Sequence, residues 1–197
     1  MILLCRHAET ASNREGRLQG RADPPLTAVG VAQAGRLAAR VAGERPVAVV
    51  SSPATRARET AAAIAGAAGL DGVTVDDRFV ELDYGDWDGL PVGDPAIPWA
   101  RWRADAGLRP PGGESLVDLR ARVTTALEDL VAAHGDAVIV VVSHVSPIKA
   151  AVVWATGAAD GITWRMHLDL ASITRLRVGR DGTPTLWGFN DVAHLEG

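Results

Sequence analysis

The sequence lacks the features that mark several large classes of protein. It has a single cysteine, Cys5, which excludes an internal disulfide. No apolar run approaches the ~20 residues that a membrane-spanning helix needs, and charge appears too early in the first residues for a signal peptide. We therefore expect a cytoplasmic protein with no membrane partner. A net charge of −4 at pH 7 argues against nucleic acid as its main partner.

Three sets of catalytic residues are also missing. No Gly-x-x-x-x-Gly-Lys-Ser/Thr loop is present, which argues against nucleoside triphosphate chemistry of the P-loop kind. The five histidines and the carboxylates show no metal-ligand spacing such as His-Glu-x-x-His, so we expect neither a metal nor another cofactor. A cysteine-dependent phosphatase needs an arginine six residues after its nucleophile, where this chain has Ala11. Cys5 lies in an apolar run, where a thiol is usually inert.

Lysine is almost absent as well. Lys149 is the only lysine among the 20 basic residues, and alanine is abundant. This pattern is typical of the codon bias of a GC-rich genome. The number of arginines is therefore not evidence of function.

The apolar pattern alternates short strands with helices. Apolar runs at residues 2–5, 47–50 and 138–142 predict buried strands. Thr27 is expected to cap one helix, and Ser115 with Asp118 another that ends before Gly135. Two Ser-Pro pairs, at 52–53 and 146–147, predict helices that begin with proline in the first position. Residues 172–178 and 185–189 alternate as two antiparallel strands.

These elements predict an α/β fold, a three-layer αβα sandwich with a mostly parallel central sheet. The length suits a single domain over residues 1–197, with a short lid-like insertion at about 90–111. His7 and His144 end two of the strands, and Arg56 lies in the first turn of a helix that follows a third. Because ligands collect at the carboxyl ends of parallel strands, these groups predict one anion-binding site.

Several longer motifs extend this pattern and carry a family resemblance. They are Arg6-His7-Ala8-Glu9-Thr10, residues 16–20 (GRLQG), 51–60 (SSPATRARET), 81–89 (ELDYGDWDG), 112–115 (GGES), Val142-Ser143-His144 and the tail 190–195. In this order they resemble the histidine phosphatase superfamily, the phosphoglycerate-mutase-like enzymes. The chain departs from the family pattern at Ala8, where glycine is usual, and at Asp88, where glutamate is frequent. Neither position carries the chemistry.

The resemblance implies a role for each matching residue. His7 would be the nucleophile that becomes a phosphohistidine, and Glu81 the acid and base that serves the leaving group and then water. The groups that would bind the phosphate are Arg6, Asn13, Arg56 and His144. We further expect Gln19 and two tryptophans of the 90–111 segment, Trp99 and Trp102, to contact the substrate. Their helical spacing fits packing in the core about equally well.

The expected activity is hydrolysis of a small phosphate monoester, as in the broad-specificity acid phosphatases of the family. The main alternative is a cofactor-dependent phosphoglycerate mutase, although members of that branch usually have a longer insertion after the Gly89 region. A catalytically silent phosphate-binding module is the remaining alternative, but no catalytic histidine or arginine is lost. The sequence does not identify the substrate. It also does not determine the oligomeric state, and a homodimer is possible.

Overall fold

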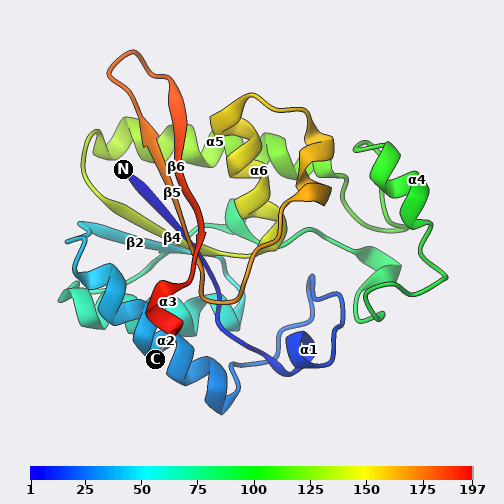
Figure 1. Cartoon of the computed structure of the whole chain (residues 1–197), viewed down its shortest axis with the longest axis horizontal. Coiled ribbons are helices and arrows are strands. Elements are labelled where there is room, and N and C mark those ends of the chain that lie inside the picture. The colour runs from blue at the N-terminus through cyan, green and yellow to red at the C-terminus, as the bar shows by residue number, and fades with distance from the viewer. Residues whose placement is uncertain (197) are drawn as a thin grey trace.

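The computed structural model describes residues 1–196 and places one sheet between two layers of helices (Figure 1). The strand order is β3-β2-β4-β1-β5-β6. Strands β3, β2, β4 and β1 are parallel, β5 runs antiparallel to β1, and β6 runs antiparallel to β5. The expected α/β fold with a mostly parallel sheet is confirmed. The strands are β1 (Ile2–Arg6), β2 (Ala48–Ser51), β3 (Thr74–Val75), β4 (Ile139–Ser143), β5 (Ile173–Val178) and β6 (Pro184–Asp191).

The helices between these strands differ widely in length. The longer ones cover the sheet, and short ones border the loops at one edge of it. The α-helices are α1 (Ala11–Arg14), α2 (Ala28–Ala42), α3 (Thr55–Ala68), α4 (Trp99–Ala104), α5 (Leu116–His134) and α6 (Val145–Thr156). The 3₁₀-helices are η1 (Asp77–Phe79), η2 (Gly85–Trp87), η3 (Asp160–Arg165) and η4 (Ala193–Leu195).

Strand β1 is buried on both faces and divides the core in two. Its side chains alternate between the faces of the sheet, as in any strand. Leu3 and Cys5 pack with α2 and α3 in one cluster, and Ile2 and Leu4 pack with α5 and α6 in the other. This explains why the first strand reads as a continuous apolar run rather than as an alternating one.

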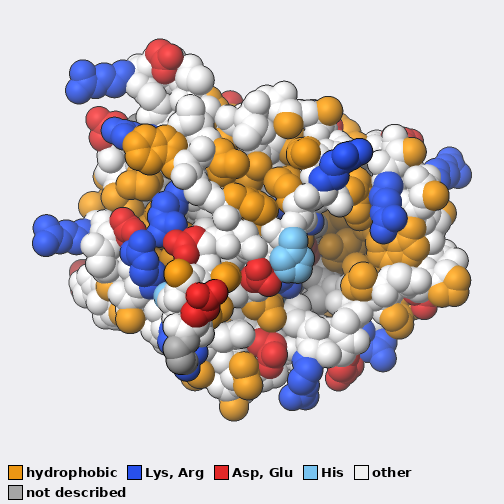
Figure 2. Space-filling view, viewed as in Figure 1, with side chains coloured by type: hydrophobic (Ala, Val, Ile, Leu, Met, Phe, Trp, Pro, Cys, Tyr) orange, Lys and Arg blue, Asp and Glu red, His pale blue; other side chains and the backbone are white. Residues whose placement is uncertain are grey.

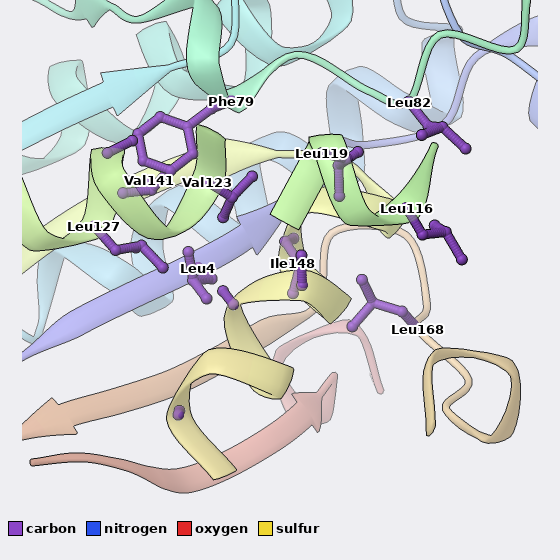
Figure 3. Close-up of a cluster of buried hydrophobic side chains, with 14 of the residues drawn as sticks. Leu4, Phe79, Leu82, Leu116, Leu119, Val123, Leu127, Val141, Ile148 and Leu168 are labelled. Atoms are coloured by element: carbon purple, nitrogen blue, oxygen red, sulfur yellow. The ribbon is translucent and has the colours of Figure 1, made fainter. Parts of the chain in front are cut away.

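Helix α5 supplies much of the second cluster (Figure 3). Its stripe of Leu119, Val123 and Leu127 faces the sheet at Leu4 and Val141. All five side chains are almost completely buried. Burying a leucine or valine contributes roughly 1.5–3 kcal/mol relative to leaving it in water, so this stripe holds α5 on the sheet.

Two of the predicted helix starts are confirmed. The Thr27 side chain accepts a hydrogen bond from the Gly30 N–H at the start of α2. Ser115 and Asp118 form a reciprocal capping box at the start of α5, and that helix ends before Gly135.

The two Ser-Pro predictions were wrong about where the helices begin. Helix α3 begins at Thr55, two residues after Pro53, because the Ser52 hydroxyl lies against the buried ring of His144 instead of capping the helix. Helix α6 begins at Val145, so Pro147 is its third residue. Proline fits there because the first four N–H groups of a helix have no partner within it.

The segment expected to act as a lid, residues 90–111, carries α4 and extends to one side of the molecule (Figure 1). Two of its side chains, Ile97 and Trp102, are buried in the same cluster as α5. None of the helices in residues 1–196 has the length and hydrophobicity to cross a membrane.

Candidate active site

The parallel pairing of β1 with β4 brings two histidines together. Arg6 pairs with Ser143 in register, so that His7 and His144 follow their strands side by side. The centroids of the two rings are 5.1 Å apart. Arg56, the second residue of α3, lies against them from the side of β2. The structure thus brings together the three groups that the sequence predicted at one edge of the sheet.

His7 has a defined free nitrogen. Its Nδ1 lies 2.8 Å from the carbonyl oxygen of Ala8, and a carbonyl can only accept a hydrogen bond. Nδ1 therefore carries the proton, and Nε2 keeps its lone pair. Burial, with the charges of Arg6 and Arg56 in addition, lowers the pKa of His7 well below 6.5. A neutral imidazole with an unprotonated Nε2 is the form that attacks phosphorus.

His144 is also neutral and is held from both sides. The Nε–H of Arg56 donates to His144 Nδ1 at 3.3 Å. The proton is then on Nε2, which donates to the Ser52 hydroxyl at 2.7 Å. Burial and the nearby charge of Arg56 lower the pKa of His144 well below its usual value. Ser52, which the sequence suggested only as a helix cap, fixes the orientation of this ring.

Besides His144, Arg56 contacts the loop 19–23. It is completely buried, and its two terminal nitrogens donate to the carbonyl oxygens of Gln19, Gly20 and Ala22. Asp88 holds the same loop from the other side, because its carboxylate accepts from the N–H groups of residues 20–22. The guanidinium donors of Arg56 thus go to protein acceptors, and its direct contact with phosphate stays a prediction.

Arg6 has an open donor. Its Nη1 donates to the carbonyl oxygen of Leu168 at 2.6 Å, whereas its buried Nε has no partner in residues 1–196. Burial lowers the pKa of Arg6 to about 10, so that it stays cationic at neutral pH. A buried donor without an acceptor is costly unless a ligand supplies one.

A cavity of about 180 Å³ collects the polar groups of the site. Arg6, His7, Asn13, Gln19 and Glu81 all line it. The Nε2 of Gln19 is buried without a partner, like the Nε of Arg6. Asn13 accepts from Thr10 through its Oδ1, so its NH₂ group is left for a ligand. The cavity is therefore lined by several residues that carry N–H donors and by the neutral His7, a combination that suits an oxyanion.

Glu81 is the acidic residue in the wall of this cavity. Its carboxylate accepts hydrogen bonds from the N–H groups of Leu82, at 2.7 Å, and Ser146, at 3.2 Å. Ser146 lies in the first turn of α6, directly after His144 and Val145. The carboxylate is thus fixed by two elements on the wall that it shares with His7.

The two tryptophans of α4 lie near this cavity in a different environment. Trp102 is almost fully buried and packs edge-on against Tyr84, Trp87 and Trp164. Trp99 donates through Nε1 to the carbonyl oxygen of Asp94. Both line a second, apolar cavity that adjoins the first. Trp102 is therefore a core residue as well as part of a cavity wall, and contact of either ring with substrate stays a prediction.

Cys5 takes no part in the site. It is completely buried, and burial raises the pKa of its thiol to about 12. A thiol of this kind is not a nucleophile at neutral pH.

One supporting group could not be foreseen from the sequence. Asn190 has a left-handed backbone (φ 55°), and its side chain binds both the N–H and the carboxylate of Asp169 at 2.7 Å. Asp169 follows Leu168, whose carbonyl holds Arg6. The tail 190–195 belongs to the motifs quoted above, but its connection to Arg6 exists only in the folded chain.

The comparisons with known proteins show the family to which the chain belongs. Residues 2–192 match the model of the histidine phosphatase superfamily (branch 1), and the chain belongs to this family. A bifunctional protein of Mycobacterium tuberculosis is 39% identical over 98% of the chain, but the match covers only 54% of that protein. The chain thus spans about half the length of the first curated relatives that it matches.

Two further relatives match over most of their own length. Phosphoserine phosphatase 1 of Hydrogenobacter thermophilus is 35% identical, over 98% of this chain and 93% of that protein. The structure of a mycobacterial glucosyl-3-phosphoglycerate phosphatase with VO3 superposes with a TM-score of 0.87 at 32% identity. That superposition covers 96% of this chain and 98% of the other. The resemblance noted in the sequence is therefore confirmed at the level of family and fold.

The burial of the two histidines has a measurable consequence. We expect the imidazoles of His7 and His144 to stay neutral as the pH falls through 6.5. The unfolded chain binds protons there that the folded chain does not, so the free energy of unfolding should decrease below about pH 6.5. An NMR titration of the ring signals, assigned with His7→Gln, and denaturant unfolding at several pH values test this. A His7 ring that titrates at or above 6.5 would contradict it.

The support of Arg6 by Asn190 can be tested with two variants. Asn190→Gly removes the side chain but allows the left-handed backbone, whereas Asn190→Ala also introduces strain of ~1–2 kcal/mol. Both should weaken the binding of inorganic phosphate about tenfold, the scale of one charge-assisted hydrogen bond. Only the alanine variant should lose further thermal stability. Calorimetric binding and melting curves measure both effects, and unchanged phosphate affinity in Asn190→Gly would rule out the positioning role.

Proposed function

We propose that this protein is a phosphatase that hydrolyses small phosphate monoesters through a phosphohistidine at His7. The observation that carries the proposal is the free Nε2 of a buried, neutral His7 in the same small cavity as the partnerless Nε of Arg6. Membership of the histidine phosphatase superfamily supports it. The names of the phosphoserine and glucosyl-3-phosphoglycerate phosphatases support a small substrate.

The first chemical step transfers the phosphoryl group to the enzyme. A bond forms between His7 Nε2 and phosphorus while the bond from phosphorus to the ester oxygen breaks. The protonated carboxyl of Glu81 gives its proton to the departing oxygen, which leaves as an alcohol. The nucleophile needs no deprotonation, because Nε2 carries no proton and Nδ1 keeps its own, which it donates to the Ala8 carbonyl oxygen.

The second step returns the enzyme to its starting state. A water molecule gives a proton to the Glu81 carboxylate and attacks the phosphorus, and the bond to His7 Nε2 breaks. Inorganic phosphate leaves, and Glu81 is again protonated. One carboxylate therefore serves as acid and then as base, which requires it to lie on the side of the leaving group in both steps.

The charge of the transferring group is balanced by fixed donors. Arg6, Asn13 and Gln19 line the cavity, and the charge of Arg56 lies close by, beside His144. Donors that are in place before the reaction stabilise the transition state without reorganisation. His144 lies beside His7 with both ring nitrogens bonded to Arg56 and Ser52, so its direct contact with phosphate requires its bond to Ser52 to be exchanged for one to the ligand.

The length and packing of the segment 90–111 favour phosphatase activity over mutase activity. A mutase must retain a doubly charged sugar-acid intermediate and exclude water. Here the segment is short, it is tied to the core by Trp102, and the polar cavity has a volume of only about 180 Å³. Transfer to water needs no more room than this.

The covalent step predicts how His7 variants behave. His7→Ala should abolish phosphate release from a panel of metabolite monoesters, assayed in the presence of a metal chelator, while the circular dichroism spectrum stays unchanged. Wild-type enzyme mixed with a labelled substrate should keep its label after an alkaline quench and lose it after an acid quench, because a phosphoramidate is acid-labile. Appreciable turnover by His7→Ala would remove the phosphohistidine mechanism.

The role of Glu81 predicts a dependence on the leaving group. Glu81→Gln keeps an oxygen that can accept from Leu82 and Ser146 but cannot deliver the proton. It should slow the phosphorylation step about 100-fold for a sugar phosphate. The loss should be much smaller for p-nitrophenyl phosphate, whose leaving group is a stable anion. Because Glu81 also activates water, the pre-steady-state burst is the quantity to compare.

Asn13→Ala is the matched control for this experiment. It removes a donor to the phosphate that both substrates share, so it should slow the two bursts by similar factors. An equal loss for both substrates in Glu81→Gln as well would reassign Glu81 to positioning.

A further inference from the structure

An apolar cavity of about 170 Å³ lies next to the polar cavity of His7. The two cavities share Leu18, Tyr84, Val92 and Val145 in their walls, so they form one continuous depression. Figure 2 shows a hollow whose wall on the side of α4 is covered by hydrophobic side chains. An engineered apolar cavity of about 150 Å³ binds benzene, so this one has room for a ring-sized group.

Aromatic rings dominate the walls of this second cavity. Trp99 and Trp102 come from α4, Trp164 from η3, and Tyr84 from the loop before η2. These rings pack against one another in edge-on or tilted pairs, with centroids 5.0–6.1 Å apart. Such walls favour a planar or ring-shaped partner.

Lys149 is the one charged residue that lines the apolar cavity. It lies on α6 and is about half buried, its ammonium is in none of the side-chain hydrogen bonds or ion pairs within residues 1–196, and the nitrogen is not among the fully buried atoms without a partner, so water reaches it. Burial lowers its pKa, and the attraction of Glu81 offsets only part of this effect. A cation is costly in an apolar wall unless it has an anionic partner. The chain has no other lysine, so codon bias toward arginine makes this residue stand out.

Lys149 lies on the side of the site from which the leaving group is expected to depart. It lies one turn after Ser146, whose N–H holds Glu81. In the mechanism above, Glu81 gives its proton to the ester oxygen, so the alcohol part of the substrate must extend past Glu81. The apolar cavity is the space that opens there.

We propose that the apolar cavity binds the alcohol part of the substrate and that Lys149 binds a carboxylate on it. The preferred substrates are then phosphate monoesters of ring-shaped or apolar alcohols that carry a carboxylate group. The proposal rests on the proposed phosphatase function, because it uses the direction in which the leaving group departs. It goes beyond that function by naming a specificity-determining residue and the chemical class that it selects.

The first experiment compares two substrates that differ only in the carboxylate. Benzyl phosphate and 4-carboxybenzyl phosphate have leaving groups of similar basicity, because the methylene group insulates the ester oxygen. Wild-type enzyme should show a kcat/KM about tenfold or more higher for the carboxylated substrate, the scale of a charge-assisted hydrogen bond. In Lys149→Met, which keeps the length of the side chain, this preference should disappear. Lys149→Arg should recover part of it.

The same experiment distinguishes binding of the substrate carboxylate by Lys149 from an indirect effect of Lys149 on Glu81. If Lys149 acted only through the proton of Glu81, Lys149→Met would slow both substrates by the same factor. That outcome, or an unchanged preference in Lys149→Met, would overturn the proposal. Melting curves of the variants show whether each is folded.

A binding measurement makes the proposal independent of turnover. 4-(Phosphonomethyl)benzoate and benzylphosphonate cannot be hydrolysed, and the wild-type enzyme should bind the first about tenfold more tightly, whereas Lys149→Met should bind the two alike. If no monoester is hydrolysed but this difference is found, the proposed function fails and the carboxylate site stands. If monoesters are hydrolysed and the difference is absent, the carboxylate site fails alone.

The single lysine allows a direct check of its environment. An acylating reagent for amines can modify only the Lys149 Nζ and the amino terminus, and mass spectrometry distinguishes the two. We expect 4-(phosphonomethyl)benzoate to protect Lys149, and benzylphosphonate to protect it much less, with equal labelling of Met1 in both. Equal protection by both phosphonates would contradict a contact between Lys149 and the carboxylate.

Discussion

The site depends on two guanidinium groups being buried beside two imidazoles. Arg56, His7 and His144 are buried at the carboxyl edge of the sheet, and Arg6, which is partly buried, lies beside them. Bringing four cations to one place would be prohibitive in a medium of low dielectric constant. The conflict is resolved because both imidazoles give up their protons, as the lowered pKa values of His7 and His144 indicate. The same neutrality leaves the lone pair of His7 Nε2 free, as the proposed nucleophilic role requires.

The buried arginines differ in how they are held, and this divides their roles. Arg56 makes contacts with His144 and with three carbonyl oxygens of the loop 19–23, so that it ties the loop to the sheet. Arg6 donates to one carbonyl, that of Leu168, and within residues 1–196 its buried Nε has no partner. An arginine with all donors satisfied stabilises the fold and contributes its charge. An arginine with an open donor is prepared for an anion.

Much of the fold and the centre of the site were predictable from the sequence because they follow from local rules. The apolar runs identified the strands, Thr27 and Ser115 identified two helix starts, and the strand ends placed His7 and His144 at one edge. The Ser-Pro starts were wrong because a tertiary contact, that of Ser52 with His144, overrode the local capping preference. The support of Arg6 through Asp169 and Asn190 spans long separations in sequence and a left-handed φ. No local pattern encodes such a connection.

The two adjoining cavities explain how one chemistry can serve different substrates within a fold. The polar cavity is built from groups at the ends of strands, whose positions the register of the sheet determines. The apolar cavity is built from residues of α4, η3, α5, the first turns of α6 and connecting loops, all of which lie outside the sheet. Changes in the segment 90–111 or at Lys149 therefore alter what is bound beside Glu81 without moving the imidazole of His7. The two cavities meet at the wall residues that they share, and Ser146, which lines the apolar cavity, holds Glu81 of the polar cavity through its N–H. In the proposed mechanism, a substrate that fills the apolar cavity would shield Glu81 from water until the alcohol has left, which would favour phosphoryl transfer to His7 before hydrolysis.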